Sequence, residues 1–173
     1  EVRTVMSLLD IEQPDYDVHE WNMEHVLKPL GIVDREAAKT TFFGWLYNPN
    51  STKIKDSIYD RDTILSKWYD DGFISTPFKR KINVDKNKAL NYIVQSTTAD
   101  LVNERAVEID KFLKGKKSFI SHIVHDEVVV DVADEERNLI PEMKDIFSNN
   151  TLGRYKTNLK AGKDYKNLGD LKL

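Results

Sequence analysis

The stretch 119–133 constrains the fold of this 173-residue chain most, because two strand-forming runs meet there at a short polar sequence. The triplet His125, Asp126 and Glu127 separates the two runs. This pattern predicts a β-hairpin with two adjacent carboxylates at its tip. Two acids at a turn repel each other unless a cation or water screens them, and Mg²⁺ prefers carboxylate oxygen. The tip is therefore either a metal site or a solvated acidic turn, and isolated triplets of this kind are usually the latter.

Residues 34–47 form a second pattern, which predicts a helix that Asp34 caps and that ends before Pro49. Four side chains at i+4 spacing share one slowly turning face of this helix: Arg35, Lys39, Phe43 and Tyr47. Cations suit phosphate oxygens and flat rings suit a base, so the face fits a nucleoside triphosphate. A helix that packs its rings and leaves its cations in solvent would show the same pattern.

Composition narrows the class of protein. The chain has no cysteine, so it has neither a disulfide framework nor a thiolate zinc site. No apolar run approaches the roughly 20 residues that a membrane span needs. The net charge of −3 argues against a uniformly basic nucleic-acid binder. Basic residues cluster locally at 79–88, 114–117 and 154–166, and each cluster is either solvated surface or a contact with a phosphate backbone.

Apolar spacing also predicts the remaining elements. Helices are expected at 1–10, 18–29, 56–71, 85–113 and from about 134 to 147. A second hairpin is expected at 73–82, and residues 155–165 alternate like a strand. On the longest helix, Asn91 and Gln95 are four residues apart, so both amides can project from one face.

These motifs resemble the DNA polymerase I family, the family A DNA polymerases, along nearly the whole chain. The hairpin ends in V-H-D-E, as the third conserved palm block of that family does. The fingers helix of the family carries R-x-x-x-K-x-x-x-F-G-x-x-Y-G, and the chain matches it at Arg35, Lys39, Phe43, Gly44 and Tyr47. Residues 91–101 resemble its N-x-P-x-Q-G-T-A-A-D-L block, with Ser96 in place of the first Gly. Asp17-Val18-His19 resembles its D-I-H, and Glu1-Val2-Arg3 resembles the end of its first palm block.

The resemblance implies an α+β fold, a fragment of the polymerase right hand with a helical fingers lobe and an antiparallel palm sheet flanked by helices. Residues 1–33 would follow the first palm strand, 34–90 would form the fingers, and 91–173 would form the palm with the hairpin. The first metal-binding Asp of the family would lie five positions before Glu1, and the thumb would also be missing. We therefore expect the fragment to be catalytically inactive by itself.

The resemblance also implies a role for each candidate residue. Asp126 would hold a catalytic metal ion with Glu127 beside it, and Lys39 would bind the phosphates and protonate the leaving pyrophosphate. The implied nucleotide-binding residues are Glu1, His19, Arg35, Lys39, Phe43 and Tyr47, with Glu1 as the steric gate against a 2′-hydroxyl unless it is only a frayed terminal acid. The implied DNA-binding residues are Asn91, Gln95 and His125.

The implied activity is that of a DNA-directed DNA polymerase, which transfers deoxynucleotides to a primer 3′ end with two Mg²⁺ ions. Its partners would be primer–template DNA and deoxynucleoside triphosphates, without a membrane, in the cytoplasm of a bacterial or phage-infected cell. Two alternatives stay open. One is a non-catalytic polymerase-like module that binds nucleic acid. The other is an unrelated α+β nucleotide-binding protein in which the helix and the hairpin lie far apart.

Overall fold

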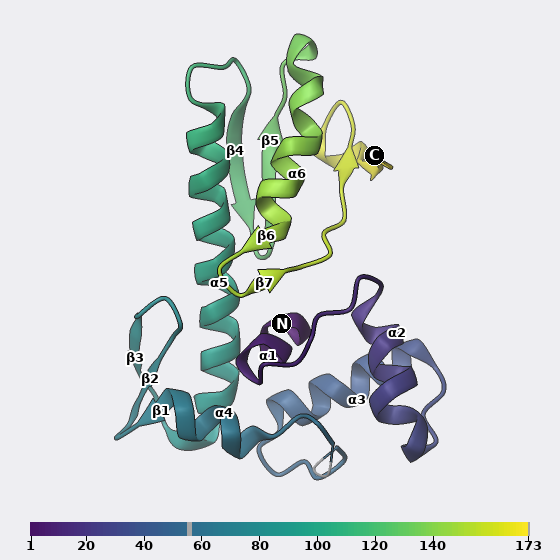
Figure 1. Ribbon diagram of the computed structural model, residues 1–173, viewed down its shortest axis with the longest axis vertical. Coiled ribbons are helices and arrows are strands. Elements are labelled where there is room, and N and C mark those ends of the chain that lie inside the picture. The colour runs from purple at the N-terminus through teal and green to yellow at the C-terminus, as the bar shows by residue number, and fades with distance from the viewer. Residues whose placement is uncertain (55–56, 173) are drawn as a thin grey trace. The chain divides into compact units, whose positions relative to one another are not determined.

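The computed structural model describes residues 1–54 and 57–172 and has two compact units, Glu1–Asp100 and Leu101–Leu173. Both units combine helices with small antiparallel sheets (Figure 1), so the predicted α+β class is confirmed. None of the helices in the described ranges is long and apolar enough to cross a membrane. The predicted division into 1–33, 34–90 and 91–173 refers to the palm and fingers of a polymerase, which need not coincide with compact units. That division stays a prediction.

Unit 1 contains most of the helices. Its helical elements are α1 (Val2–Leu8), α2 (Val18–Asn22), a π-helical turn (Met23–Leu27), a 3₁₀ turn (Lys28–Leu30), α3 (Arg35–Tyr47), α4 (Arg61–Trp68) and the first part of α5 (Lys86–Leu113). Three short strands, β1 (Tyr69–Asp70), β2 (Phe73–Ser75) and β3 (Lys81–Asn83), pair in the order β1-β2-β3 and include the predicted second hairpin.

An aspartate begins each of α2, α3 and α4. Asp17, Asp34 and Asp60 accept hydrogen bonds from backbone N–H groups of the first helical turn. These bonds satisfy donors that a helix N-terminus would otherwise leave unpaired. The cap at Asp34 was predicted. The helix expected from residue 56 begins instead at Arg61, after the Asp60 cap, and Asp56 itself lies outside the described residues.

The core of unit 1 combines the buried side of α3 with buried residues of α1, α4 and α5. Its large, fully buried side chains include Met6, Phe42, Trp45, Tyr59, Ile64 and Ile93. Phe42 lies at the centre of an aromatic cluster, with ring centroids 5.6 Å from Trp45 and 5.0 Å from Tyr59. Because Phe42 and Trp45 point into this core, the opposite face of α3 is directed outward.

Unit 2 is built on the predicted hairpin. It contains the rest of α5, β4 (Phe119–Val124), β5 (Glu127–Asp131), a 3₁₀ helix (Asp134–Leu139), α6 (Ile140–Ser148), β6 (Asn149–Asn150), β7 (Gly153–Arg154), β8 (Lys160–Ala161), a 3₁₀ turn (Tyr165–Asn167) and β9 (Gly169–Asp170). The hairpin runs alongside α5 and α6 (Figure 1), and Ile120, Val128 and Val130 pack on a small core from these helices.

Three expected elements differ in detail. The helix predicted at 18–29 is α-helical only to Asn22 and ends in a tighter turn that contains Pro29, which has no N–H to donate. The helix predicted from 134 is first 3₁₀ and becomes α-helical at Ile140, where Pro141 suits the first turn. Regular strand pairing within 155–165 is confined to Lys160–Ala161, although the side chains of 155–160 do alternate between half-buried and exposed.

Candidate nucleotide-binding face and acidic hairpin

The outward face of α3 carries the predicted cationic-to-aromatic series. The rings of Phe43 and Tyr47 are stacked, with centroids 5.8 Å apart and planes 12° from parallel. They border a shallow hollow of about 580 Å³, lined by Glu36, Lys39, Thr40, Phe43, Gly44, Tyr47 and Asn48. Gly44 contributes no side chain, and a Cβ there would meet no atom within 4 Å, so the hollow stays open between the rings and Lys39.

Arg35, at the other end of this face, is held by Asp17. Its Nη2 and Nε atoms donate to the two carboxylate oxygens at 2.8 and 3.2 Å. Partial burial would by itself raise the pKa of Asp17, but hydrogen bonds from Arg35 and from the backbone N–H groups of His19 and Glu20 lower that pKa to about 2. The hydrogen bond with Asp17 in turn raises the pKa of Arg35. The pair is therefore ionised at any physiological pH.

His19 lies beside the same face. Its ring centroid is 6.0 Å from that of Phe43, and its Nδ1 atom is buried without a hydrogen-bond partner within the described ranges. Burial lowers the pKa of His19; Asp17 opposes this effect, and the charges of Arg35 and Lys39 add to it. The ring is consequently neutral near pH 7 and has an unused polar atom.

Of the two cations on this face, Lys39 has the weaker ion pair. Its nearest acid is Glu36, with Nζ and Oε2 3.9 Å apart, and 46% of the lysine side chain is exposed. An exposed pair of this kind contributes only about 0.5 kcal/mol, so the ammonium can exchange it for a stronger anion at little cost.

Three candidate residues from distant segments meet at the aromatic end of the face. The Tyr47 hydroxyl donates to Glu1 Oε2 at 2.6 Å. Burial and this hydrogen bond raise the pKa of Tyr47 to about 12, while a hydrogen bond with the Gln95 side chain acts in the opposite direction. The sequence suggested a role for each residue separately but gave no sign that they touch. One turn earlier on α5, Asn91 Oδ1 is buried and has no hydrogen-bond partner in the described part of the chain.

The predicted hairpin is present in unit 2, but its turn is shorter than the expected triplet, because Glu127 is the first residue of β5. Val124 is opposite Glu127, which leaves His125 and Asp126 as a two-residue turn. His125 has a φ of +52°, a conformation that tight hairpin turns require and that His adopts more readily than most residues. The side chains of His125, Asp126 and Glu127 are all exposed, so the carboxylates are accessible to a ligand.

A residue from the C-terminal segment contacts the hairpin. The Tyr165 hydroxyl donates to Glu127 Oε2 at 3.3 Å, and the negative charge of Glu127 raises the pKa of Tyr165. The Tyr165 ring also meets His122 edge-on, with centroids 5.5 Å apart. Sequence reasoning did not find this contact, because no periodic pattern connects residues so far apart.

The residues present do not by themselves fit a centre for two Mg²⁺ ions. Asp126 and Glu127 offer oxygen ligands of the right chemistry. However, no group of three or more His, Asp or Glu side chains that could hold a metal ion occurs within 1–54 and 57–172. Metal binding by Asp126 stays a prediction, and further ligands would have to complete the site.

The helical unit and the hairpin-bearing unit together define an α+β polymerase-like fold. No family model matches the sequence, and no curated protein matches it. Among solved structures, the chain is similar to the polymerase domain of Pol1 from M. smegmatis in complex with DNA primer-template and dNTP, with a TM-score of 0.64 and 19% sequence identity. The match covers 86% of this chain and 35% of that chain, so this chain spans about a third of the length of its neighbour. The resemblance to family A DNA polymerases is thus confirmed at the level of the fold.

Proposed function

We propose that this chain is part of a DNA-directed DNA polymerase that transfers deoxynucleotides to a primer 3′ end. The outward face of α3 binds the incoming deoxynucleoside triphosphate, and the hairpin supplies Asp126 to a Mg²⁺ site that other carboxylates complete. The observation that carries this proposal is the hollow along α3, which has Lys39 at one end and the stacked rings of Phe43 and Tyr47 at the other.

The chemistry of the face matches the polarity of a nucleotide. Ammonium and guanidinium groups bind phosphate oxygens through charge-assisted hydrogen bonds, which places the triphosphate toward Lys39 and Arg35. Flat aromatic surface suits the base and sugar, which places them toward Phe43 and Tyr47. Lys39 then lies where it can donate a proton to the leaving pyrophosphate, as the sequence resemblance implies.

The cluster of Glu1, Tyr47 and Gln95 gives the aromatic end its selectivity. The Tyr47 hydroxyl holds the Glu1 carboxylate at 2.6 Å, and a fixed carboxylate beside the sugar would exclude a 2′-hydroxyl. Gln95 and Asn91 would contact the minor-groove edge of the primer terminus, where acceptors are common to all correct base pairs. His125 would touch the primer end from the hairpin.

Nucleotide binding by a Lys39→Ala variant tests the proposal. A charge-assisted hydrogen bond contributes about 1.5–3 kcal/mol, so we expect the Kd for a fluorescent deoxynucleoside triphosphate to rise by about tenfold to a hundredfold. Fluorescence anisotropy with Mg²⁺ present measures it. The same variant should not weaken binding of the unphosphorylated nucleoside, because Lys39 is assigned to the phosphates.

Lys28→Ala is the matched control. Lys28 is an exposed lysine of the same unit and lies outside the α3 face. We expect its Kd to stay within about twofold of the unaltered chain, since isolated surface changes have small effects. Equal losses in the two lysine variants, or no triphosphate binding by the unaltered chain, would contradict the assignment.

A non-catalytic nucleic-acid-binding module is the second candidate. The hairpin tip brings together only two acidic side chains in the described ranges, which is the observation that favours it. Such a module would bind primer–template DNA but would show no Mg²⁺-dependent binding of deoxynucleoside triphosphates. The anisotropy assay therefore separates the two functions.

A further inference from the structure

The C-terminal part of unit 2 carries lysines that belong neither to the α3 face nor to the hairpin tip. Between residues 151 and 163 the sequence contains no Asp or Glu. Arg154 is already bound there, since it donates to Asn149 Oδ1 at 2.8 Å and to Asp145 Oδ1 at 2.9 Å. Four exposed lysines have no ion pair within the described ranges, and we name them the basic row: Lys156, Lys160, Lys163 and Lys166.

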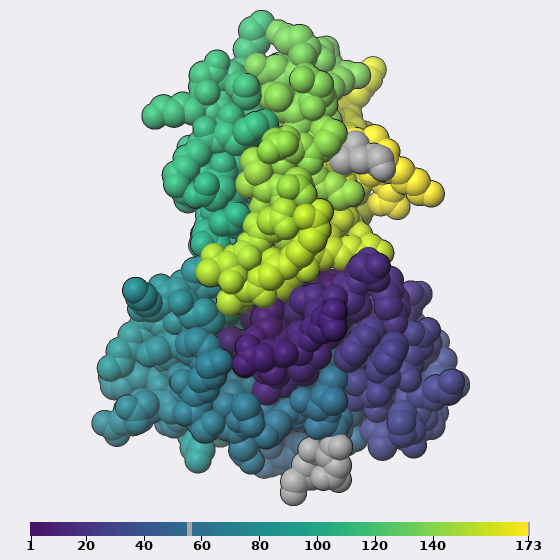
Figure 2. Space-filling view, in the orientation of Figure 1, coloured from purple at the N-terminus to yellow at the C-terminus, as the bar shows by residue number. Residues whose placement is uncertain are grey.

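The first part of this row lies on one side of an extended segment. Tyr155, Thr157 and Leu159 are half-buried. The intervening Lys156, Asn158 and Lys160 are exposed. In an extended segment, every second side chain points to the same side, and two residues advance the chain by roughly 6.6 Å. The side chains of Lys156, Asn158 and Lys160 therefore project from the surface at this regular spacing. The segment lies on the surface of unit 2, in yellow-green and yellow in Figure 2.

The segment is fixed in place rather than loosely attached. Ser148 at the end of α6 hydrogen-bonds its hydroxyl to that of Thr157 at 2.6 Å, and the N–H of Tyr155 donates to the Ser148 carbonyl at 2.9 Å. Farther along, the N–H of Leu171 donates to the Leu159 carbonyl at 2.9 Å. Because the backbone of the segment is already ordered, binding a partner would cost conformational entropy mainly in the lysine side chains.

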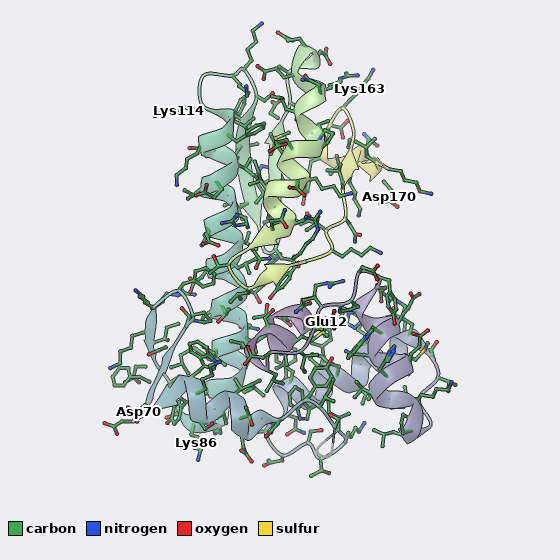
Figure 3. The ribbon with its side chains drawn as sticks, in the orientation of Figure 1. Glu12, Asp70, Lys86, Lys114, Lys163 and Asp170 are labelled. Atoms are coloured by element: carbon green, nitrogen blue, oxygen red, sulfur yellow. The ribbon has the colours of Figure 1, made fainter. Side chains whose placement is uncertain are left out.

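The far end of the row lies beside the hairpin. Lys163 is at the tip of the loop between β8 and β9 (Figure 3), and Tyr165 on the same loop contacts Glu127, the neighbour of Asp126. Two acids lie nearby, but neither forms an ion pair with a lysine of the row in the described part of the chain. Asp164 accepts hydrogen bonds from the N–H groups of Lys166 and Asn167. Asp170 lies opposite Lys160 across β8 and β9 but forms no ion pair in the described part of the chain.

We propose that the basic row binds the sugar-phosphate backbone of the DNA strand that leads to the hairpin tip. The inference rests on the proposed function, because it names the surface of unit 2 that holds the primer–template. A strand of nucleic acid presents negative charges at regular intervals, and exposed lysines at fixed spacing complement them. Lysine acts on phosphate as a point charge, so this contact would position the strand without reading its sequence.

The test compares two variants of equal net charge. One replaces three lysines of the row, K156Q/K160Q/K163Q. The control replaces three exposed lysines elsewhere, K28Q/K53Q/K114Q. Lys114 lies on the other side of unit 2 from Lys163 in Figure 3. The Kd for a fluorescein-labelled primer–template is measured by anisotropy over a series of NaCl concentrations, with thermal melting to confirm that both variants fold.

The row variant should raise the Kd about tenfold or more near 0.1 M salt and reduce the slope of log Kd against log salt by about two to three, since each phosphate contact contributes about 0.9. The control should change the Kd by less than about threefold. Equal effects of the two variants, or an unchanged slope, overturn the inference and leave the proposed function standing. No DNA binding by the unaltered chain overturns both.

A cross-linking experiment locates the strand directly. Because the chain has no cysteine, Asn158→Cys creates one thiol between Lys156 and Lys160, to which a photoactivatable group can be attached. We expect this group to label the primer–template. Asn138→Cys, at an exposed position of the same unit, is the matched control. Equal labelling from the two positions would overturn the proposed location.

Discussion

Arg35 on α3 donates one hydrogen bond to each carboxylate oxygen of Asp17, at 2.8 and 3.2 Å, and Asp17 at the same time caps α2. The Asp17 carboxylate therefore positions two residues at the end of the α3 face that is proposed to bind the phosphates. It holds the guanidinium of Arg35, and through the α2 cap it orients the turn that carries His19. The resemblance to family A polymerases pointed to Arg35 and to the Asp17-Val18-His19 motif, whereas the contact of Asp17 with Arg35 emerges only from the structure.

The first prediction concerns the pH dependence of stability. Asp17 has a folded pKa of about 2, below its ordinary 3.8, so it stabilises the fold above the unfolded pKa and this contribution is lost as the pH falls from about 4 to about 2. Because the two side chains are 39% and 35% exposed, water screens the pair and we expect about 1 kcal/mol. Urea unfolding of the unaltered chain and of Asp17→Asn across this range measures the difference.

Asparagine caps a helix about as well as aspartate, so Asp17→Asn removes the charge and keeps the cap. Asp15→Asn provides the control, because Asp15 is exposed and forms no ion pair in the described ranges. The unaltered chain and Asp15→Asn should lose stability in parallel toward low pH, and Asp17→Asn should lose less. If all three curves are parallel, the Asp17–Arg35 pair does not stabilise the fold.

The second prediction uses two neighbouring phenylalanines on α3. Phe42 is fully buried, whereas Phe43 is half-buried and borders the hollow. Phe42→Ala should lower the free energy of unfolding by about 3–5 kcal/mol, because it leaves a cavity in the core. Phe43→Ala should cost much less stability and should weaken nucleotide binding. Denaturant unfolding and the triphosphate anisotropy assay measure the two effects, and the assignment fails if Phe43→Ala binds nucleotide as tightly as the unaltered chain.

The third prediction concerns sugar selectivity. Tyr47→Phe keeps the ring stacked on Phe43 but removes the hydroxyl that holds Glu1. A carboxylate that can move excludes a 2′-hydroxyl less well, so the ratio of ribonucleotide Kd to deoxyribonucleotide Kd should fall by several-fold. Tyr47→Ala, which also removes the ring, should weaken binding of both nucleotides. An unchanged ratio in Tyr47→Phe would remove Glu1 from its predicted role.

The elements that were predicted most accurately are those that depend on residues close together in the sequence. The Asp34 cap, the i+4 series on α3 and the hairpin with its polar tip each follow from residues within a few positions of one another. The contacts of Tyr47 with Glu1 and of Tyr165 with Glu127 depend on the path of the whole chain. Periodicity carries no information about such long-range contacts, so they could not be predicted.

Arg80 illustrates a second limit of sequence reasoning. It belongs to the basic cluster at 79–88, for which solvent and a phosphate backbone were the two expected partners. In the structure, its Nη2 donates to the Ser96 carbonyl at 2.9 Å and its Nε lies 3.0 Å from Asp100 Oδ1, so it joins the β2–β3 hairpin to α5. A cluster of basic residues in a sequence does not show which cations form contacts within the fold and which can bind a ligand.

The last prediction concerns catalysis by the chain as it stands. Two-metal phosphoryl transfer needs ligands on both ions, and the exposed pair Asp126 and Glu127 offers too few oxygen atoms to hold two ions in fixed positions. We therefore expect no primer extension when the purified chain is incubated with labelled primer–template, deoxynucleoside triphosphates and Mg²⁺, even where anisotropy shows that both substrates bind. In the absence of Mg²⁺, Asp126→Ala should bind DNA and nucleotide with the same Kd values as the unaltered chain. Extension by the unaltered chain that disappears in Asp126→Ala would show instead that the hairpin forms a working centre with groups already in this chain.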